Sequence, residues 1–140
     1  MHSKLKIPVG EFTSPSPASV NEDTPVSTVL EMMEAHGCRH VPVLFQNRVS
    51  GIISDRDIYR HRVAQADGEC LQARDIMTRE VYRVRERTNI DQVVFAMSDR
   101  KISSAIVEDR ETNFIGIFTS TDALNALVEV VRGQYDDNIS

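Results

Sequence analysis

The sequence has few of the features on which secreted and membrane proteins depend. Only two cysteines occur in 140 residues, Cys38 and Cys70, whereas a disulfide framework needs denser, regularly spaced cysteines. We therefore expect both to be reduced thiols. No apolar run approaches the roughly 18 residues of a membrane span, and the N-terminus lacks the apolar core of a signal peptide. We expect a cytoplasmic protein that does not insert into a membrane.

An excess of basic residues is also missing. The chain has 16 Lys and Arg against 21 Asp and Glu, which gives a net charge of −5. Proteins that bind nucleic acid through overall charge need a basic face that displaces counterions from the phosphates. The charge balance argues against a nucleic-acid partner, although it leaves room for a local basic pocket.

Common catalytic motifs are absent as well. The sequence contains no Gly-x-Ser-x-Gly nucleophile elbow, no dinucleotide-binding Gly-x-Gly-x-x-Gly and no P-loop. His36, Cys38 and His40 span an expected helix end and strand start, which is no recognised zinc-ligand spacing. The carboxylates of Asp55 and Asp57 diverge around an expected helix start and do not suit a shared acid–base role. We expect no catalytic residues, no metal and no required cofactor.

What the sequence does contain is a repeated heptad. Residues 51–57 read Gly-Ile-Ile-Ser-Asp-Arg-Asp, and residues 116–122 read Gly-Ile-Phe-Thr-Ser-Thr-Asp. The offset is constant, since 116 minus 51 and 122 minus 57 both give 65. A period of this length indicates two copies of one supersecondary unit. We expect each copy to be a strand that runs into a helix start, with its hydroxyl and carboxylate facing a small-molecule pocket.

The hydrophobic pattern of the first half predicts alternating strands and helices. Pro8, Gly10 and a Pro-rich run favour an extended chain up to residue 17, followed by a short strand at 18–20. Thr24-Pro25 predicts a helix N-cap and first residue, with Gly37 at the stop. Two β-type runs, 40–45 and 49–53, predict a hairpin, and Asp55 is expected to cap a helix over 57–66.

The second half repeats this order. A strand is expected at 81–84, and the apolar spacing of Ile90, Val93 and Met97 reproduces that of Val26, Val29 and Met33 with an offset of 64. A second hairpin, 104–107 with 114–119, has a turn one residue longer. The last helix should begin at residue 121 or 122 and end before Gly133, and residues 134–140 should form a loose tail.

These features together resemble the regulatory module made of two CBS (cystathionine-β-synthase-type) motifs in tandem. The resemblance is carried by Asp75-Ile76-Met77-Thr78, by the Val41-Pro42-Val43 strand and by the two heptads. It implies an α/β (α+β) fold of two β-α-β-β-α motifs packed about a pseudo-twofold axis. The implied division is an N-terminal segment 1–10, motif one at 11–66, a linker at 67–74, motif two at 75–133 and a tail at 134–140.

The resemblance also implies a function. Such modules are regulatory rather than catalytic and bind adenosine-containing ligands in two clefts between their motifs. AMP, ADP or ATP is the expected ligand, with S-adenosylmethionine and NAD as further candidates. A stand-alone module would signal to a regulated enzyme or transporter and form a homodimer, with Leu124, Leu127 and Val128 as the expected surface. The alternative is a ligand-free interaction scaffold with the same fold.

Site residues follow from the family match. An ionised carboxylate can accept from both adjacent hydroxyls of a ribose, which is the role implied for Asp57 and Asp122. Both could instead be simple helix caps. The hydroxyls Ser54, Thr119 and Thr121 lie where free helix amides attract phosphate, although local capping explains them equally well.

The basic and apolar candidates make the two copies unequal. Arg39, His40 and Arg56 suit phosphate in the first copy, unless the arginines are merely solvated. Their counterparts in the second copy are Ser103, Ser104 and Thr121, so one cleft should hold more positive charge. Adenine contacts are expected from Val41, Pro42, Ile106, Thr13 and Thr78. Pro42 should lie at a strand edge or cleft rim because it lacks an amide hydrogen, and Phe12 should stand where Met77 stands.

Overall fold

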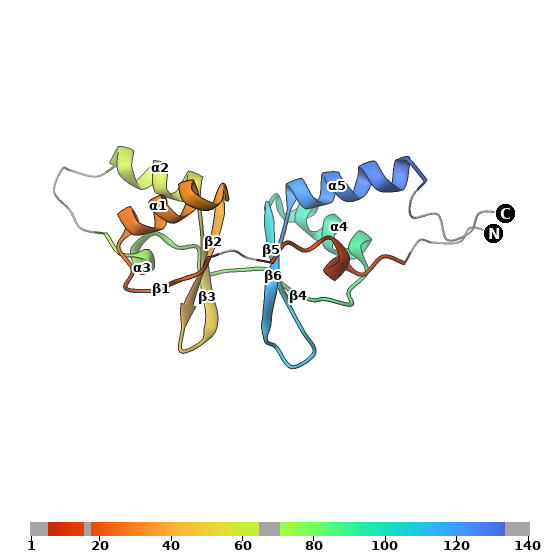
Figure 1. Ribbon diagram of the computed structural model, residues 1–140, viewed down its shortest axis with the longest axis horizontal. Coiled ribbons are helices and arrows are strands. Elements are labelled where there is room, and N and C mark those ends of the chain that lie inside the picture. Colours follow the sequence, from red (N-terminus) through yellow and green to blue (C-terminus); the bar gives the residue numbers. More distant parts are fainter. Residues whose placement is uncertain (1–5, 16–17, 65–70, 134–140) are drawn as a thin grey trace. The chain divides into compact units, whose positions relative to one another are not determined.

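The computed structural model describes residues 6–15, 18–64 and 71–133 (Figure 1). These residues form two compact units. The first-repeat unit comprises residues 18–64 and 71–81, and the second-repeat unit joins residues 6–15 to residues 82–133. Each unit has its own three-stranded sheet, and no helix in the described ranges is long and apolar enough to cross a membrane.

The first-repeat unit has the predicted order of elements. Strand β1 (Val20–Asn21), helix α1 (Val26–His36), strands β2 (His40–Phe45) and β3 (Arg48–Ser54) and helix α2 (Asp55–Ala64) are followed by the short helix α3 (Ala73–Ile76). The sheet order is β1-β2-β3, with β1 parallel and β3 antiparallel to β2. Gly37 ends α1 with a φ of 64°, a left-handed conformation that glycine adopts without strain.

The second-repeat unit has the same topology. It contains the 3-10 helix η1 (Val9–Phe12), strand β4 (Arg83–Arg85), helix α4 (Ile90–Arg100), strands β5 (Ser104–Glu108) and β6 (Phe114–Thr119), and helix α5 (Ser120–Val131). Its sheet order is β4-β5-β6, again parallel and then antiparallel. The expected mixed fold of two β-α-β-β-α repeats is therefore confirmed.

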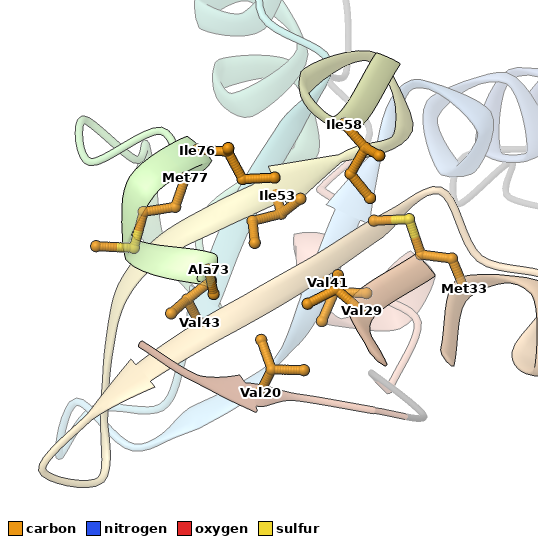
Figure 2. Close-up of a cluster of buried hydrophobic side chains, with 10 residues drawn as sticks. All are labelled: Val20, Val29, Met33, Val41, Val43, Ile53, Ile58, Ala73, Ile76 and Met77. Carbon is orange, nitrogen blue, oxygen red and sulfur yellow. The ribbon is translucent and has the colours of Figure 1, made fainter. Parts of the chain in front are cut away.

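Each unit has a hydrophobic core between its sheet and its helices. Figure 2 shows the first, which contains Val20, Val29, Met33, Val41, Val43, Ile53, Ile58, Ala73, Ile76 and Met77. The second contains Val9, Val84, Val93, Met97, Ala105, Val107 and Phe118. Alternate residues of a strand point to opposite faces, so Val41 and Val43 enter the core while Pro42 lies on the other face of the sheet.

The compact units do not follow the repeats at the segment that leads into each one. Helix η1 precedes the first repeat in sequence but packs in the second-repeat unit, where Val9 is fully buried and Gly10 N donates to Glu86 O (2.9 Å). Helix α3 precedes the second repeat but packs in the first-repeat unit, where Ala73 N donates to Thr24 O (2.8 Å). The predicted motif bounds, 11–66 and 75–133, divide the chain by sequence repeat. In the structure, each lead-in segment instead packs in the unit formed by the other repeat.

The heptad glycines allow the lead-in segments to approach the sheets. Ser14 and Ile117 exchange two backbone hydrogen bonds (3.1 and 3.0 Å), and so do Thr78 and Ile52 (2.9 and 3.0 Å). A Cβ on Gly51 would lie 2.8 Å from Thr78 O, and a Cβ on Gly116 would overlap Ser14 O. A side chain at either position would therefore push the lead-in segment away from the sheet.

Pro42 is not at a strand edge, and that expectation is wrong. It lies in β2, the central strand, and is fully buried. Its counterpart Ile106 donates its amide to Tyr82 O (2.7 Å), a hydrogen bond that proline cannot make. Strand β4 accordingly pairs with β5 from Arg83, whereas β1 begins to pair with β2 only at Val20, opposite Val43. The sheet tolerates Pro42 because the parallel ladder starts one residue later.

Several local expectations are also wrong. Residues 9–12 form η1 instead of an extended chain, because Val9 packs into a core from another part of the chain. The N-cap position of α1 is Pro25, while the Thr24 hydroxyl accepts from Asn21 N (3.0 Å). Helix α2 begins at Asp55, which therefore does not cap it, and α5 begins at Ser120. The expected tail 134–140 and Cys70 lie outside the described residues, and Cys38 is a free thiol.

Candidate functional site

The two heptads end in the same local structure, a capping box at the start of a helix. Ser54 Oγ accepts from Asp57 N (3.1 Å), and the Asp57 carboxylate accepts from Ser54 N (2.8 Å) through Oδ2. Thr119 and Asp122 make the same pair of bonds (3.3 and 2.8 Å). Both aspartates are thus helix caps. A carboxylate has a second oxygen with its own lone pairs, so capping leaves a further contact available.

The second oxygen distinguishes the two aspartates. In the described part of the chain, no hydrogen-bond donor reaches Asp57 Oδ1, and the residue is half-buried. Asp122 Oδ1 accepts a hydrogen bond from Ser14 Oγ (3.0 Å), and Asp122 is only 8% exposed. Asp122 Oδ2 also accepts from Thr119 Oγ1 (3.0 Å). Asp57 can therefore bind a further donor directly, whereas Asp122 is already engaged on both oxygens.

Basic side chains gather near Asp57. Asp55 N donates to Arg39 O (3.0 Å), which ties the start of β2 to the first turn of α2, where Arg56 lies exposed. His40 pairs with Ser54 across the hairpin. Burial lowers the pKa of His40, and the nearby carboxylates of Asp55 and Asp57 oppose this shift, while Arg39 and Arg56 add to it. The structure thus brings the predicted basic residues to one helix N-terminus.

The matching positions in the second-repeat unit are uncharged. Ser120 N donates to Ser103 O (3.1 Å), the same backbone link that Asp55 makes with Arg39. Ser104 pairs with Thr119 across the hairpin, and Thr121 lies exposed in the first turn of α5. The second-repeat unit therefore lacks basic residues at the positions where the first-repeat unit has Arg39, His40 and Arg56.

The predicted apolar contacts are divided between the two faces of the sheets. Val41 is fully buried in the first core, so its side chain is directed toward the helices of its own unit. Pro42 and Ile106 are buried but lie on the opposite face of their central strands. Thr13 Oγ1 donates to Val9 O (2.8 Å), and Thr78 is exposed beside Ile52. Pro42 and Ile106 thus remain the better placed of these candidates.

Ser14 is absent from the predicted site residues because the predicted match of Phe12 with Met77 sets the lead-in segments at an offset of 65. The bridges Ser14–Ile117 and Thr78–Ile52 make Ser14 the counterpart of Thr78, and 78 minus 14 gives 64. Thr13 therefore corresponds to Met77, and the expected match of Phe12 with Met77 is wrong. The first helices of the two repeats are also offset by 64 residues, and this offset indicates the correct match of the lead-in segments. The extra residue that changes the offset to 65 enters the chain only at the second hairpin.

Metal binding finds no support in the described ranges. No group of three or more His, Cys, Asp or Glu side chains in residues 6–15, 18–64 and 71–133 is arranged to hold a metal ion. Capped carboxylates, backbone amides at a helix N-terminus and arginines are instead groups that bind polar hydroxyls and phosphates. The site is chemically suited to a phosphorylated sugar.

Comparison with known proteins identifies the family. The model of the CBS domain matches twice, at residues 9–64 and 73–129, and the chain therefore belongs to the CBS-domain proteins. An uncharacterized protein of Methanocaldococcus jannaschii is 33% identical over 107 residues, 75% of this chain and 25% of that protein. A homoserine O-acetyltransferase of Methanocorpusculum labreanum is 26% identical over 129 residues, 85% of this chain and 26% of that protein. The chain spans about a quarter of the length of these relatives.

Solved structures share the fold. The CBS domain pair of protein MJ0100, in complex with 5′-methylthioadenosine and S-adenosyl-L-methionine, has a TM-score of 0.79 at 25% identity, covering 89% of this chain and 98% of that one. An uncharacterized conserved protein from Pyrococcus horikoshii has a TM-score of 0.78 at 22% identity, covering 89% and 95%. CBSX2 in complex with AMP has a TM-score of 0.75 at 24% identity, covering 89% and 98%. The chain is a CBS domain pair.

Proposed function

We propose that this protein is a non-catalytic regulatory module that binds an adenosine-containing ligand at the Asp57 site. The observation that carries the proposal is the second carboxylate oxygen of Asp57, which no donor in the described residues engages, at a helix N-terminus with basic neighbours. The similar CBS domain pair of protein MJ0100 was solved with two adenosine derivatives. AMP, ADP and ATP are the primary candidate ligands, and S-adenosylmethionine and NAD are the others.

Each chemical group of such a ligand has a candidate partner in the first-repeat unit. Asp57 Oδ1 would accept hydrogen bonds from the two ribose hydroxyls, since an ionised carboxylate oxygen accepts strongly. The phosphates would meet the positive end of the α2 dipole, together with the Ser54 hydroxyl. Arg39, His40 and Arg56 would add charge-assisted contacts. The adenine would lie against the face of the sheet that carries Pro42.

Signalling requires that the ligand bind two states of the protein with different affinity. The regulated partner, an enzyme or a transporter, must then respond to the same two states, and its own binding must change ligand affinity by the same factor. We propose that the module acts in the cytoplasm as a homodimer. Helix α5 offers the contact surface, because Leu124, Leu127 and Val128 are 62%, 57% and 44% exposed.

A scaffold without a ligand is the second candidate function. The exposed apolar face of α5 favours it, since side chains of this size at this exposure are suited to a protein partner. This function would need neither carboxylate. The two functions therefore differ in whether small adenosine-containing molecules stabilise the fold.

Thermal unfolding with AMP, ADP, ATP, S-adenosylmethionine and NAD tests the proposal. A ligand that binds only the folded state adds about 2.7 kcal/mol at a concentration of about 100 times Kd, and the midpoint rises accordingly. The absence of any shift at about millimolar ligand would favour the scaffold. The 2′-deoxy form of the best ligand should bind more weakly, because it lacks one of the hydroxyls that Asp57 would hold.

The Asp57→Ala variant tests the site itself, and Asp75→Ala is its matched control. Asp75 also closes a capping box, accepting from Gln72 N (2.8 Å), but it lies in α3 and is no candidate ligand residue. Both variants lose a cap, whereas only Asp57→Ala should lose ligand affinity. An equal loss in both variants would assign the effect to stability and remove the ribose role from Asp57.

A further inference from the structure

The Ser14 hydroxyl contacts the oxygen of Asp122 whose counterpart on Asp57 receives no donor from the described residues. Ser14 Oγ lies 3.0 Å from Asp122 Oδ1, and Thr119 supplies a backbone and a side-chain donor to Oδ2 at 2.8 and 3.0 Å. Asp122 is one of only two polar residues among the buried residues of the described chain. A buried carboxylate must have donors, and here the chain provides all three that are seen.

The Ser14 donor comes from a segment that is fixed in place. Ser14 exchanges two backbone hydrogen bonds with Ile117, and Gly116 allows this close approach because any side chain there would overlap Ser14 O. The next turn is secured by the bond from Thr13 Oγ1 to Val9 O (2.8 Å), and Val9 is fully buried in the core. The hydroxyl is therefore presented to Asp122 by a rigid backbone rather than by a free end.

The first-repeat unit has no equivalent contact. Thr78 bridges Ile52 as Ser14 bridges Ile117, but Thr78 is exposed, and its hydroxyl makes no hydrogen bond to Asp57 in the described residues. The two lead-in segments thus dock in the same way, and only one of them reaches the aspartate with its hydroxyl. The difference lies in side-chain contact and not in topology.

We propose that Ser14 is an internal competitor that mimics a ligand hydroxyl and closes Asp122, so that the Asp57 site is the one open in the free protein. This inference rests on the proposed function, because it concerns the same class of ligand. Ser14 holds one of the two lone-pair positions that a pair of ribose hydroxyls would need on Asp122 Oδ1, so both hydroxyls can bind there only after the Ser14 side chain rotates to another staggered position. Ser14 then loses a hydrogen bond to a charged acceptor, which should weaken binding there by about 10-fold or more.

Isothermal titration with AMP tests the proposal, using Asp57→Asn to silence the open site. Asparagine keeps an oxygen for the cap but loses the negative charge. We expect the wild type to bind one AMP per chain and Asp57→Asn to bind none at about millimolar AMP. The double variant Asp57→Asn/Ser14→Ala should regain measurable binding at the same AMP concentration, which corresponds to a gain in affinity of at least about 10-fold. The regained binding should disappear again when Asp122→Asn is added.

Three further variants show that the effect belongs to the hydroxyl. In the Asp57→Asn background, Ser14→Gly should open the site as Ser14→Ala does, and Ser14→Thr, which keeps a hydroxyl, should leave it closed. Ser50→Ala removes another serine hydroxyl, one that donates to Val43 O (3.4 Å) in the first-repeat unit, and should change nothing. Circular dichroism of each variant checks that the fold is retained.

The possible results separate this inference from the proposed function. If the wild type binds AMP but Ser14→Ala adds no binding at Asp122, the internal competitor is overturned and the proposed function stands. Two equal AMP sites in the wild type overturn it as well. If only the Ser14 variants bind AMP, Ser14 closes Asp122 as proposed, but the Asp57 site is not the open one, and both that part of the inference and ligand sensing through Asp57 are overturned. If no variant binds AMP, both ideas are overturned.

Discussion

The two units share one topology but differ in the contacts that their repeated hydroxyl and aspartate make. In the first-repeat unit, one oxygen of Asp57 receives no donor from the described residues, and Arg39, His40 and Arg56 lie near it. In the second-repeat unit, Asp122 is buried and receives the Ser14 hydroxyl, and the positions of the basic residues hold Ser and Thr. Two copies of one backbone arrangement can therefore present different chemistry, because the side chains at corresponding positions differ.

The largest effect is expected from a paired core substitution. Phe118 and Ile53 occupy matching positions in the two sheets, and both are fully buried. Phe118→Ala should destabilise the protein by about 4 kcal/mol and Ile53→Val by about 1 kcal/mol. Urea unfolding measures both. If the two units unfold independently, each variant should move only one of two transitions, whereas one shared transition would show that the units fold cooperatively.

The heptad glycines should give the next largest effect. Gly116→Ala would push its Cβ into the backbone oxygen of Ser14 and should cost about 3 kcal/mol, whereas Gly51→Ala should cost about 1 to 2 kcal/mol. The smaller value reflects a less severe backbone contact, 2.8 Å from the added Cβ to Thr78 O, while the other close atom, Met77 Sδ at 2.7 Å, belongs to a flexible side chain that can move. Hydrogen exchange at the amides of Ser14 and Thr78 locates the damage. Equal costs, or unchanged exchange at Ser14, would contradict the role of Gly116 in docking the lead-in segment.

Replacing basic residues of the first-repeat unit by their second-repeat counterparts should have an intermediate effect on ligand affinity. Arg39→Ser and Arg56→Thr give the first-repeat unit the residues that the second-repeat unit has at these positions. Each should weaken ATP binding by about 10-fold, the loss of one charge-assisted contact to phosphate, while adenosine binding changes little. Calorimetry with both ligands at two salt concentrations measures this. An equal loss for adenosine would show that the arginines act on the fold and not on phosphate.

The smallest expected effect is a change in the pH dependence of folding stability. The pKa of His40 is lowered from its ordinary value of 6.5, chiefly by burial, with Asp55 and Asp57 opposing and Arg39 and Arg56 reinforcing the shift. Below about pH 6.5 the unfolded chain takes up this proton more readily than the folded one, so the contribution of His40 to stability falls as pH falls. Urea unfolding from pH 7 to pH 5 should show a shallower loss of stability in His40→Asn than in the wild type. Parallel pH curves would contradict this assignment.

The order of elements could be predicted because it is encoded locally. The spacing of Val26, Val29 and Met33 produces the same amphipathic helix as that of Ile90, Val93 and Met97, and β-branched runs flanked by turn residues give the hairpins. The positions of Asp57 and Asp122 at helix starts follow from the same patterns. These features depend on neighbours within a few residues, which a sequence displays directly.

The parts that could not be predicted depend on distant contacts. Helices η1 and α3 are four residues each, too short to be stable alone, and they form because Val9 and Ala73 are buried in cores built by other segments. Pro42 was expected at a strand edge because proline has no amide hydrogen to donate to a neighbouring strand. The neighbouring strand avoids the conflict by starting to pair one residue later.

The sequence alone determined that this chain is a tandem repeat with a strand-to-helix junction ending in Asp57 and another ending in Asp122, because periodicity and heptad residues are local properties. Only the tertiary structure decided that Asp122 receives the Ser14 hydroxyl, whereas no described residue donates to the corresponding oxygen of Asp57. The lead-in segment with Ser14 docks on the sheet that ends at Thr119, 108 residues of chain separate Ser14 from Asp122, and no local pattern predicts their hydrogen bond. Packing of distant segments thus turns two similar motifs into two different sites.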